Sequence, residues 1–290
     1  MIKPYKKTPF AVALVGALSI APGASFAAGF ALLEQNVSGL GNAYAGSAAV
    51  AQDASTIFFN PAGLTLLPGT QAVVAGSAIY LDTEFSPTAA PVFPPFPVVT
   101  PGTDTGGNLG GWSVVPNLYF STPIGERFAV GIGVNVPFGL TTEYHDDWMG
   151  RFQGIKSELT STNVNPSVAF KVSDTVSLGA GINWQKTDAE LTNAVFLPAG
   201  LGVFVEGRTK LEADDDAWGW NVGALFQLGS DMRVGVSYRS AIDYTLEGDV
   251  STTFNGTPVA AGSFPAEAEA KFPDSALLSV TQRFGDKWEL

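Results

Sequence analysis

The stretch that decides the fold is FAVGIGVNV, residues 128–136, in which large apolar residues alternate with small or polar ones. Alternation with a period of two indicates a β-strand with two unlike faces. The same pattern recurs further along the chain, at 163–172, 178–185, 218–228 and 234–244. The sequence therefore predicts an all-β protein.

The smaller face of these strands distinguishes a soluble sandwich from a membrane barrel. It carries mainly Gly, Ala, Ser and Asn, whereas a sheet facing water would carry Lys and Glu. Charged residues make up only 14% of the chain, yet no segment after the first 27 residues is long and apolar enough for a transmembrane helix. A closed barrel satisfies every backbone polar group within a bilayer. We therefore predict a transmembrane antiparallel β-barrel with the Gly/Asn face in the lumen.

Eight strands and the start of a ninth are expected, joined by alternating short and long connections, as in membrane barrels. An eight-stranded barrel has room only for its own side chains, so a plug of ~40 residues would not fit inside it. We therefore expect the chain to cover the N-terminal part of a longer barrel that is incomplete here. The alternative is a complete eight-stranded barrel with an external N-terminal segment. The predicted strands are 70–84, 111–122, 128–140, 158–172, 176–193, 210–228, 233–246 and 270–283, and the ninth begins at Trp288.

The N-terminus divides into two predicted segments ahead of the barrel strands of 70–290. Residues 1–27 have the basic start, short apolar core and small residues before a cleavage site that characterise a secretory signal peptide. Residues 28–69 are Gly/Ala-rich but too apolar for a free linker, and we expect them to be buried as a partly helical plug in the lumen. A plugged barrel is a gated transporter and not an open pore.

Composition excludes several other classes. The chain has no cysteine, so it offers neither a disulfide framework nor a thiolate metal site. We expect no metal and no cofactor. The net charge of −12 argues against a nucleic-acid partner. An outer-membrane enzyme would need a base beside a nucleophile, but the single histidine, His145, lies beside Asp146 and Asp147 in a predicted loop.

A series of motifs then points to one family. In order, they are AGF at 28–30, SGLGNAYAG at 38–46, DAS at 53–55, NPA at 60–62, VPN at 115–117, FGL at 138–140, EY at 143–144 and YRS at 238–240. With these motifs the chain resembles the FadL/TodX family of outer-membrane transporters for long-chain fatty acids and hydrocarbons. The resemblance implies a fourteen-stranded barrel, a hatch in the lumen and an inward kink in the third strand that opens the wall sideways. The C-terminal half of the family's barrel is missing from this sequence.

The resemblance also implies a function and a location. We expect an exported protein in the outer membrane of a Gram-negative bacterium, monomeric and surrounded by outer-membrane lipid and lipopolysaccharide. It would take up a long-chain fatty acid or hydrocarbon by capture at extracellular loops, passage past the hatch and lateral exit at the kink. A porin-like channel for small solutes is the alternative. The sequence does not distinguish a fatty acid from an alkane or an aromatic hydrocarbon.

Apolar residues near both ends of the expected path are candidate ligand contacts. Residues 194–205 are unusually apolar for an extracellular loop, which favours capture of a hydrophobic ligand, although packing on neighbouring loops is equally compatible. Two residues at the start of the plug would line the path further in. The candidates are Phe196, Leu197, Leu201, Val203 and Phe204 in the loop, and Phe30 and Leu32 in the plug.

The exit candidate is Asn135-Val136-Pro137-Phe138-Gly139. Proline cannot donate to a sheet ladder and glycine permits a bulge, so strand pairing should fail there. The alternative is an ordinary strand end entering a loop. The resemblance to the kinked third strand favours an exit at Asn135, Pro137, Phe138 and Gly139.

Within the plug, Asn60-Pro61-Ala62 is expected to end a hatch helix and to fix a turn. Gly39 and Gly41 are not a dinucleotide fingerprint, because Tyr44 stands where the third glycine would be and no strand precedes them. The asparagines of the lumen face are expected to bind the backbone of the hatch. They are Asn117, Asn135, Asn163, Asn165, Asn183 and Asn221.

Arg239 is predicted to point into the lumen, on the same face as Asp243. A lumenal arginine beside a dry plug needs an anion. We expect a protein carboxylate, either Asp243 or a plug acid such as Glu34 or Asp53, because an unpaired buried charge would be costly. A ligand carboxylate is the alternative partner.

Overall fold

The computed structural model describes residues 29–86, 105–200, 203–254, 257–284 and 288–289, and within these ranges it leaves the side chains of 197–200, 203–204, 257–262 and 288–289 undescribed. The predicted signal peptide, residues 1–27, lies outside the described residues. Among the described helices, none has the length and apolar character that crossing a membrane requires.

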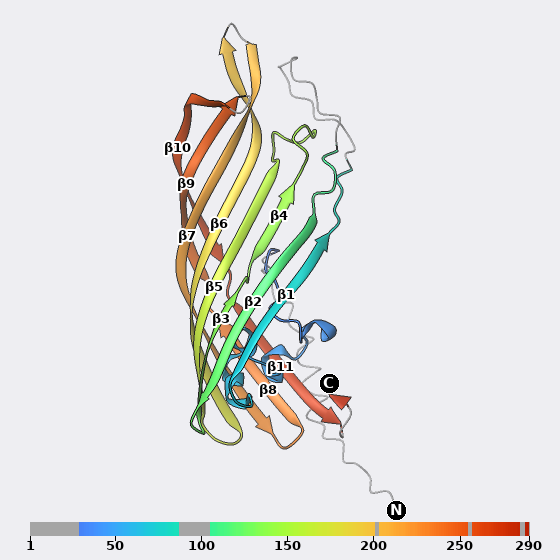
Figure 1. Cartoon of the computed structure of the whole chain (residues 1–290), viewed down its shortest axis with the longest axis vertical. Helices are drawn as coiled ribbons and strands as arrows, with labels where there is room; N and C mark the ends of the chain where they lie inside the picture. Colours follow the sequence, from blue (N-terminus) through green and yellow to red (C-terminus); the bar gives the residue numbers. More distant parts are fainter. Residues whose placement is uncertain (1–28, 87–104, 201–202, 255–256, 285–287, 290) are drawn as a thin grey trace, which may run out of the picture.

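The described strands form one curled antiparallel sheet, a half-barrel that confirms the predicted fold class (Figure 1). The strand order is β1-β2-β3-β5-β6-β7-β8-β11-β12, with β4 beside β5 and β9 between β7 and β10. The strands are β1 (Gln71–Leu81), β2 (Gly111–Ile124), β3 (Phe128–Asn135), β4 (Gly139–Glu143), β5 (Lys156–Lys171), β6 (Val176–Gly200), β7 (Val203–Leu228), β8 (Met232–Arg239), β9 (Ile242–Phe254), β10 (Thr257–Phe272), β11 (Ser275–Phe284) and β12 (Trp288–Glu289).

Short turns lie at one end of the sheet and long connections at the other (Figure 1). Gly125 and Gly229 take left-handed φ angles of 66° and 73° in two of the short turns, a conformation that glycine adopts without strain. At the opposite end β6 and β7 run on through residues 194–200 and 203–212. The predicted strands 176–193 and 210–228 left residues 194–209 to a loop, which was wrong for most of that stretch, because the strand alternation continues beyond the apolar band of the sheet.

The two faces of the sheet differ as predicted. The convex face exposes apolar side chains such as Val74 (81% exposed) and Ile182 (55%), with Trp112 and Trp218 above them toward the loop end. The concave face carries small and polar residues, many of them buried. An apolar outside with tryptophans at its border is the surface that a barrel presents to lipid.

Three of the predicted strands are interrupted. The predicted strand 128–140 is divided into β3 and β4, 233–246 into β8 and β9, and 270–283 includes the end of β10 and most of β11. Pro137 and Pro273 stand at two of the interruptions and remove ladder donors there. The interruption after Arg239 has no such residue, and the sequence alone gave no reason to expect it.

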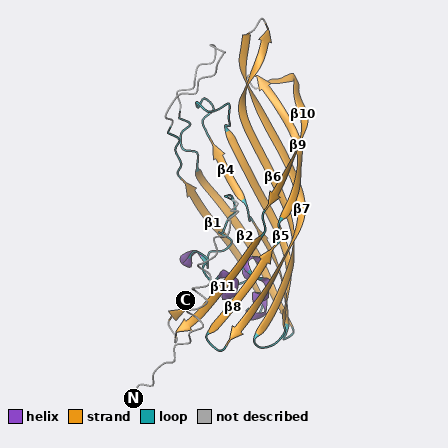
Figure 2. Ribbon diagram, turned by 180° about the vertical axis from the view of Figure 1, so that it is seen from behind, coloured by secondary structure: helices purple, strands orange, loops and turns teal. Residues whose placement is uncertain are grey.

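The N-terminal segment, residues 29–67, lies inside the curl of the sheet, near the end with the short turns (Figure 2). It contains η1 (Leu40–Asn42), α2 (Ser47–Val50), α3 (Thr56–Phe59) and η2 (Pro61–Leu66). Ile57 and Leu64 are buried in one apolar cluster with Tyr119 and Ala169 of the sheet. The core of the molecule is therefore the contact between this segment and the concave face.

Candidate functional site

Four glycines of the concave face make room for the N-terminal segment. An added Cβ would lie 2.3 Å from the Ala62 nitrogen at Gly179, and 2.0 Å from the Ala48 carbonyl oxygen at Gly235. It would lie 2.0 Å from the Asn60 side-chain oxygen at Gly223 and 2.6 Å from Ile57 Cδ1 at Gly131. These approaches are closer than any side chain permits, so the small face of the strands forms a fitted seat for the segment.

Asn60 fastens the segment to this seat. Its Nδ2 donates to the carbonyl oxygen of Ala48 at 2.7 Å and to that of Ala224 in β7 at 3.1 Å, and its Oδ1 accepts from the Ala62 amide. Asn60 precedes η2 and Pro61 is the first residue of that helix. The prediction that NPA ends a hatch helix and fixes a turn agrees with this geometry, because α3 ends at Phe59.

The lumenal asparagines bind the segment less often than predicted. Asn117 donates to Glu34 O at 2.9 Å, and Asn221 lies 3.5 Å from Ile57 O. The others bond to one another or to the strands: Asn163 donates to Asn135, and Asn165 donates to Asn221. A tyrosine that the sequence analysis had not singled out, Tyr119, donates its hydroxyl to Gln35 O at 2.9 Å. Most of the asparagines therefore form a polar network within the wall.

The ladder of the wall breaks at the predicted kink. β3 pairs with β5 up to Asn135–Asn163, and β4 resumes at Gly139–Thr160. The three residues 136–138 face the two residues 161–162, which is the one-residue excess of a β-bulge. On the other side, β2 pairs with β3 only from Leu118 to Ile124, so Gly111–Asn117 and β4 share no ladder in the described structure.

The start of the N-terminal segment occupies this break. Leu32 N donates to Pro137 O at 2.9 Å, and Gly139 N donates to Phe30 O at 3.0 Å, around an antiparallel bridge between Ala31 and Phe138. Gln35, buried in the same segment, donates Nε2 to Val136 O at 2.9 Å. Residues 30–35 thus bind Val136 O, Pro137 O and Gly139 N, while Ser161 of β5 binds both backbone groups of Phe138.

Aromatic side chains close the inner side of the kink. The Phe30 ring lies 5.6 Å from Phe138 and 5.3 Å from Phe272, and Phe272 lies 4.9 Å from Tyr244 between ring centroids. Ile242 and Leu246 of β9 complete the cluster. Leu32, predicted beside Phe30, packs over Gly139, whose added Cβ would be 3.2 Å from Leu32 Cδ1. Of the predicted contacts, Phe30, Leu32 and Phe138 therefore meet at one place.

Tyr244 was not predicted in this cluster, because unbroken alternation from β8 places its side chain on the outer, lipid-facing side of β9. β7 pairs with β8 at Asn221–Arg239 and with β9 at Asp214–Glu247, so Asp215–Trp220 face the longer stretch Ser240–Leu246. The extra residue turns Ile242, Tyr244 and Leu246 inward. A bulge re-aims side chains in this way and leaves the alternation on each side intact.

The prediction that Arg239 and Asp243 share the lumen was wrong for the same reason. Asp243 points outward, 73% exposed, and its carboxylate lies 3.1 Å from Lys271 Nζ. Arg239 remains inside, where Nη2 donates to Phe58 O at 3.1 Å and Nη1 donates to Asn183 Oδ1. Among the described residues no carboxylate lies within 4.0 Å of Arg239, so neither Glu34 nor Asp53 is its partner.

Phe196, one of the predicted capture residues, lies in β6 at the loop end. Phe196 stacks on Phe152 of the β4–β5 connection, with 4.4 Å between ring centroids, and Arg151 lies 4.9 Å above the Phe152 ring. This arrangement agrees with the alternative of packing on a neighbouring connection. The side chains of Leu197, Leu201, Val203 and Phe204 lie outside the described residues.

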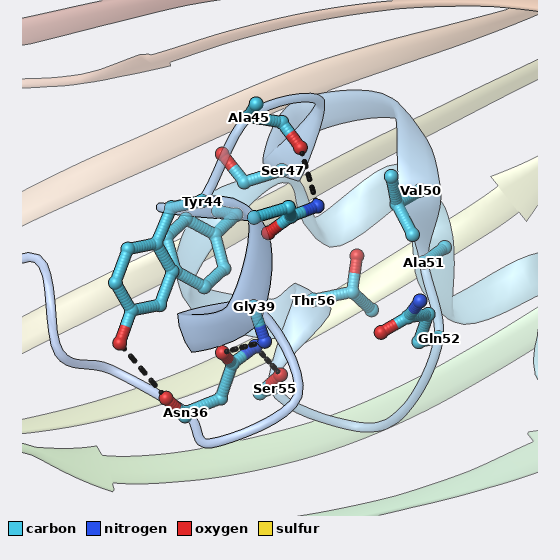
Figure 3. A pocket seen from close by; sticks show the side chains of 12 residues that line it. Asn36, Gly39, Tyr44, Ala45, Ser47, Val50, Ala51, Gln52, Ser55 and Thr56 are labelled. Atoms are coloured by element: carbon cyan, nitrogen blue, oxygen red, sulfur yellow. Dashed lines mark hydrogen bonds between the residues drawn. The ribbon is translucent and has the colours of Figure 1, made fainter. Parts of the chain in front are cut away.

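Gly39 precedes η1 and Gly41 lies within it, and Gly39 lines a small open hollow within the N-terminal segment (Figure 3). Gly39 N donates to Asn36 Oδ1 at 2.9 Å, and Asn36 Nδ2 donates to Ser55 Oγ at 2.6 Å. No group of three or more His, Cys, Asp or Glu residues in the described part of the chain is arranged to hold a metal ion.

A curled antiparallel sheet with an apolar outside, and with an N-terminal segment seated in its lumen, defines the class of plugged membrane barrels. Residues 18–290 match the family model described as outer membrane protein transport protein (OMPP1/FadL/TodX), and the chain belongs to this family. It is a family of outer-membrane transporters for fatty acids and other hydrophobic compounds, and the protein is located in the outer membrane. Expected membership in the FadL/TodX family is thus confirmed.

Individual relatives agree with this assignment. The chain is 30% identical to outer membrane protein P1 of Haemophilus influenzae over 307 aligned residues, which cover 94% of this chain and 66% of that protein. It is 28% identical to the long-chain fatty acid transport protein of Escherichia coli O6:H1, over 84% of this chain and 57% of that protein. The crystal structure of a Pseudomonas aeruginosa FadL homologue superposes with a TM-score of 0.73 at 22% identity, covering 90% of this chain and 68% of that one. The chain thus spans about two thirds or less of the length of these curated relatives.

Proposed function

We propose that this protein takes up long-chain fatty acids or other hydrophobic compounds and releases them sideways at the β3–β4 kink. The observation that carries the proposal is the bulge at residues 136–138, where the described β2 and β4 share no ladder and the N-terminal segment binds Val136 O, Pro137 O and Gly139 N. A wall that is completed by a removable segment can open without unfolding the barrel.

The physical reason for a lateral exit is the cost of wetting an acyl chain. Each CH₂ group that returns to water costs about 0.8 kcal/mol. A ligand that leaves the lumen through the wall passes from apolar side chains directly into lipid. The cluster of Phe30, Phe138, Phe272 and Tyr244 provides such side chains at the inner side of the kink.

On this proposal residues 28–69 act as the hatch, after removal of a signal peptide of residues 1–27, and residues 70–290 are barrel wall. Entry begins at the loop end, where the rings of Phe152 and Phe196 stack on each other. Ligand in the lumen then competes with Phe30 for the aromatic cluster. Displacement of Phe30 carries Leu32 away from Pro137 and frees the kink.

Transport in cells tests the proposal. Expression in a strain without its own fatty-acid transporter should permit uptake of a fluorescent long-chain fatty acid, and proteoliposomes should retain a trapped sugar. Rapid sugar efflux without fatty-acid uptake would instead support the porin-like alternative. Monomeric state and contact with lipopolysaccharide remain predictions that a native mass spectrum would test.

A further inference from the structure

The hatch consists of two parts that differ in how they contact the wall. The seated part, residues 47–67, rests on the glycines of the concave face and contains α2, α3 and η2. The leading part, residues 29–46, reaches the kink. The hollow in Figure 3 lies between them, lined by Asn36 and Tyr44 on one side and by Val50 and Thr56 on the other.

The joint between the two parts has an unusual backbone. Ala43, Tyr44 and Ala51 take φ angles of 52°, 62° and 49°, which non-glycine residues rarely adopt, and Gly46 takes 79°. Two side-chain hydrogen bonds bridge the parts, Asn36 to Ser55 and Ser38 Oγ to Asp53 Oδ2 at 2.7 Å, and the Tyr44 ring stacks on Phe59 with 5.9 Å between centroids. If the leading part turns away at this joint, these contacts and its five described hydrogen bonds to the wall break, while the bonds of the seated part to β6, β7 and β8 remain.

Two arginines of β8 hold the seated part. Arg233 donates Nη1 to Ala49 O and to Val50 O, each at 3.0 Å, where α2 ends. The last carbonyl groups of a helix have no partner within the helix and carry partial negative charge, so a cation stabilises them. Arg233 thus binds α2 at the end where its carbonyl groups face the wall.

Arg239 makes the corresponding contact with α3. It donates Nη2 to Phe58 O at 3.1 Å, and its guanidinium carbon lies 4.5 Å from the centre of the Phe58 ring. A cation above an aromatic face adds an attraction beyond the hydrogen bond. Since the described part of the chain provides no carboxylate within 4.0 Å, carbonyl, amide and ring groups are the partners of this buried charge.

The positions of the arginines along β8 explain why one strand binds both helices. Arg233, Gly235 and Arg239 all face inward, because their numbers differ by multiples of two. Gly235 lies between the arginines, and Ala48 O occupies the space where its Cβ would lie. Along β8, Arg233 therefore binds the end of α2, Gly235 leaves space for the Ala48 carbonyl group, and Arg239 binds α3.

We propose that Arg233 and Arg239 are positioning residues that fix the seated part to β8, so that only the leading part moves when a ligand passes. The inference rests on the proposed function but adds a division of the hatch. The seated part keeps ions out during uptake, while the leading part opens the kink.

Ion leak tests the arginines without requiring any transport. Arg239→Met and Arg233→Met preserve much of the side-chain length but lose the charged donors. Because hydrogen bonds to charged groups are strong, each variant should raise the fraction of time that the seated part spends away from the wall by roughly ten- to hundredfold. Conductance in planar bilayers should rise by a similar factor. Arg233→Lys should restore part of the block, whereas Arg208→Met, in an exposed pair with Asp146, should not change it. Normal conductance of folded Met variants would overturn the proposal.

A disulfide tests the division of the hatch. Thr65 Oγ1 and Ser177 Oγ lie 2.7 Å apart, one in η2 and one in β6, so Thr65→Cys with Ser177→Cys can form a bridge in this cysteine-free chain. The oxidised variant should take up fatty acid at the same rate as the reduced one and should suppress the leak of Arg239→Met. Loss of uptake on oxidation would show that the seated part moves, and the division would be wrong. Absence of uptake from the wild type would contradict the proposed function. The conductance of the Met variants would still decide whether the two arginines hold the seated part.

Discussion

Replacement of Phe30 by alanine should loosen the seal at the kink by an amount that the structure sets. The Phe30 ring forms two aromatic pairs, with Phe138 and with Phe272. Such pairs contribute about 0.5–1.5 kcal/mol each beyond the burial of their area. The variant should therefore favour the open kink by roughly 2 kcal/mol, which is about a 30-fold increase in the open fraction.

Hydrogen exchange measures that increase directly. The amides of Leu32 and Gly139 are the two backbone donors of the seal, to Pro137 O and Phe30 O. If closing is fast, their exchange rates follow the open fraction, so both should rise about 30-fold in Phe30→Ala. Leu33→Ala is the matched control, because Leu33 is 59% exposed in the same segment. Unchanged exchange at Leu32 and Gly139 would refute the reasoning, whatever the effect on uptake.

Three further changes test other parts of the path. Pro137→Val together with Gly139→Val should restore the one backbone donor that Pro137 lacks, replace the flexible glycine and lower uptake severalfold without loss of barrel stability; normal uptake at normal surface levels would argue against this exit. Gly223→Ala places a methyl group 2.0 Å from Asn60 Oδ1, so it should raise ion conductance through a displaced hatch, and unaltered conductance would show that the seat can adjust. Phe196→Ser should weaken capture, seen as slower uptake at low but not at saturating ligand, and a loss at both would instead indicate a folding role.

Strand alternation was sufficient to predict the sheet and its lumenal face. Pro137 and Gly139 suggested that strand pairing fails in the third strand, but the family resemblance was needed to prefer a kink over an ordinary strand end. Alternation was not sufficient for β9. No proline or glycine marks the extra residue near Ser240 in the sequence. A shift of one residue exchanges the two faces of a strand. For this reason Asp243 was assigned to the lumen and Tyr244 to the lipid, the reverse of what the structure shows.

The contacts of the hatch were beyond the reach of local patterns. The glycines of the small face indicated a crowded lumen, but which hatch atom meets which glycine depends on packing between segments more than 60 residues apart, as for Ile57 with Gly131. Arg239 illustrates the same limit. It was expected to need an anion, but its partners are the neutral oxygens of Phe58 and Asn183, which no pairing of charges in the sequence would select.

The central claim is that residues 30–32 must leave the kink for a ligand to pass. Ala31 and Phe138 are opposite each other in an antiparallel bridge whose hydrogen bonds are made by the neighbouring residues. The Cα atoms of such a non-hydrogen-bonded pair lie about 4.5 Å apart. A disulfide fits that distance, and the chain has no other cysteine. Fluorescent fatty-acid uptake by Ala31→Cys with Phe138→Cys should be absent under oxidising conditions and should return on reduction. Equal uptake in both states, with the bridge verified by mass spectrometry, would contradict the account.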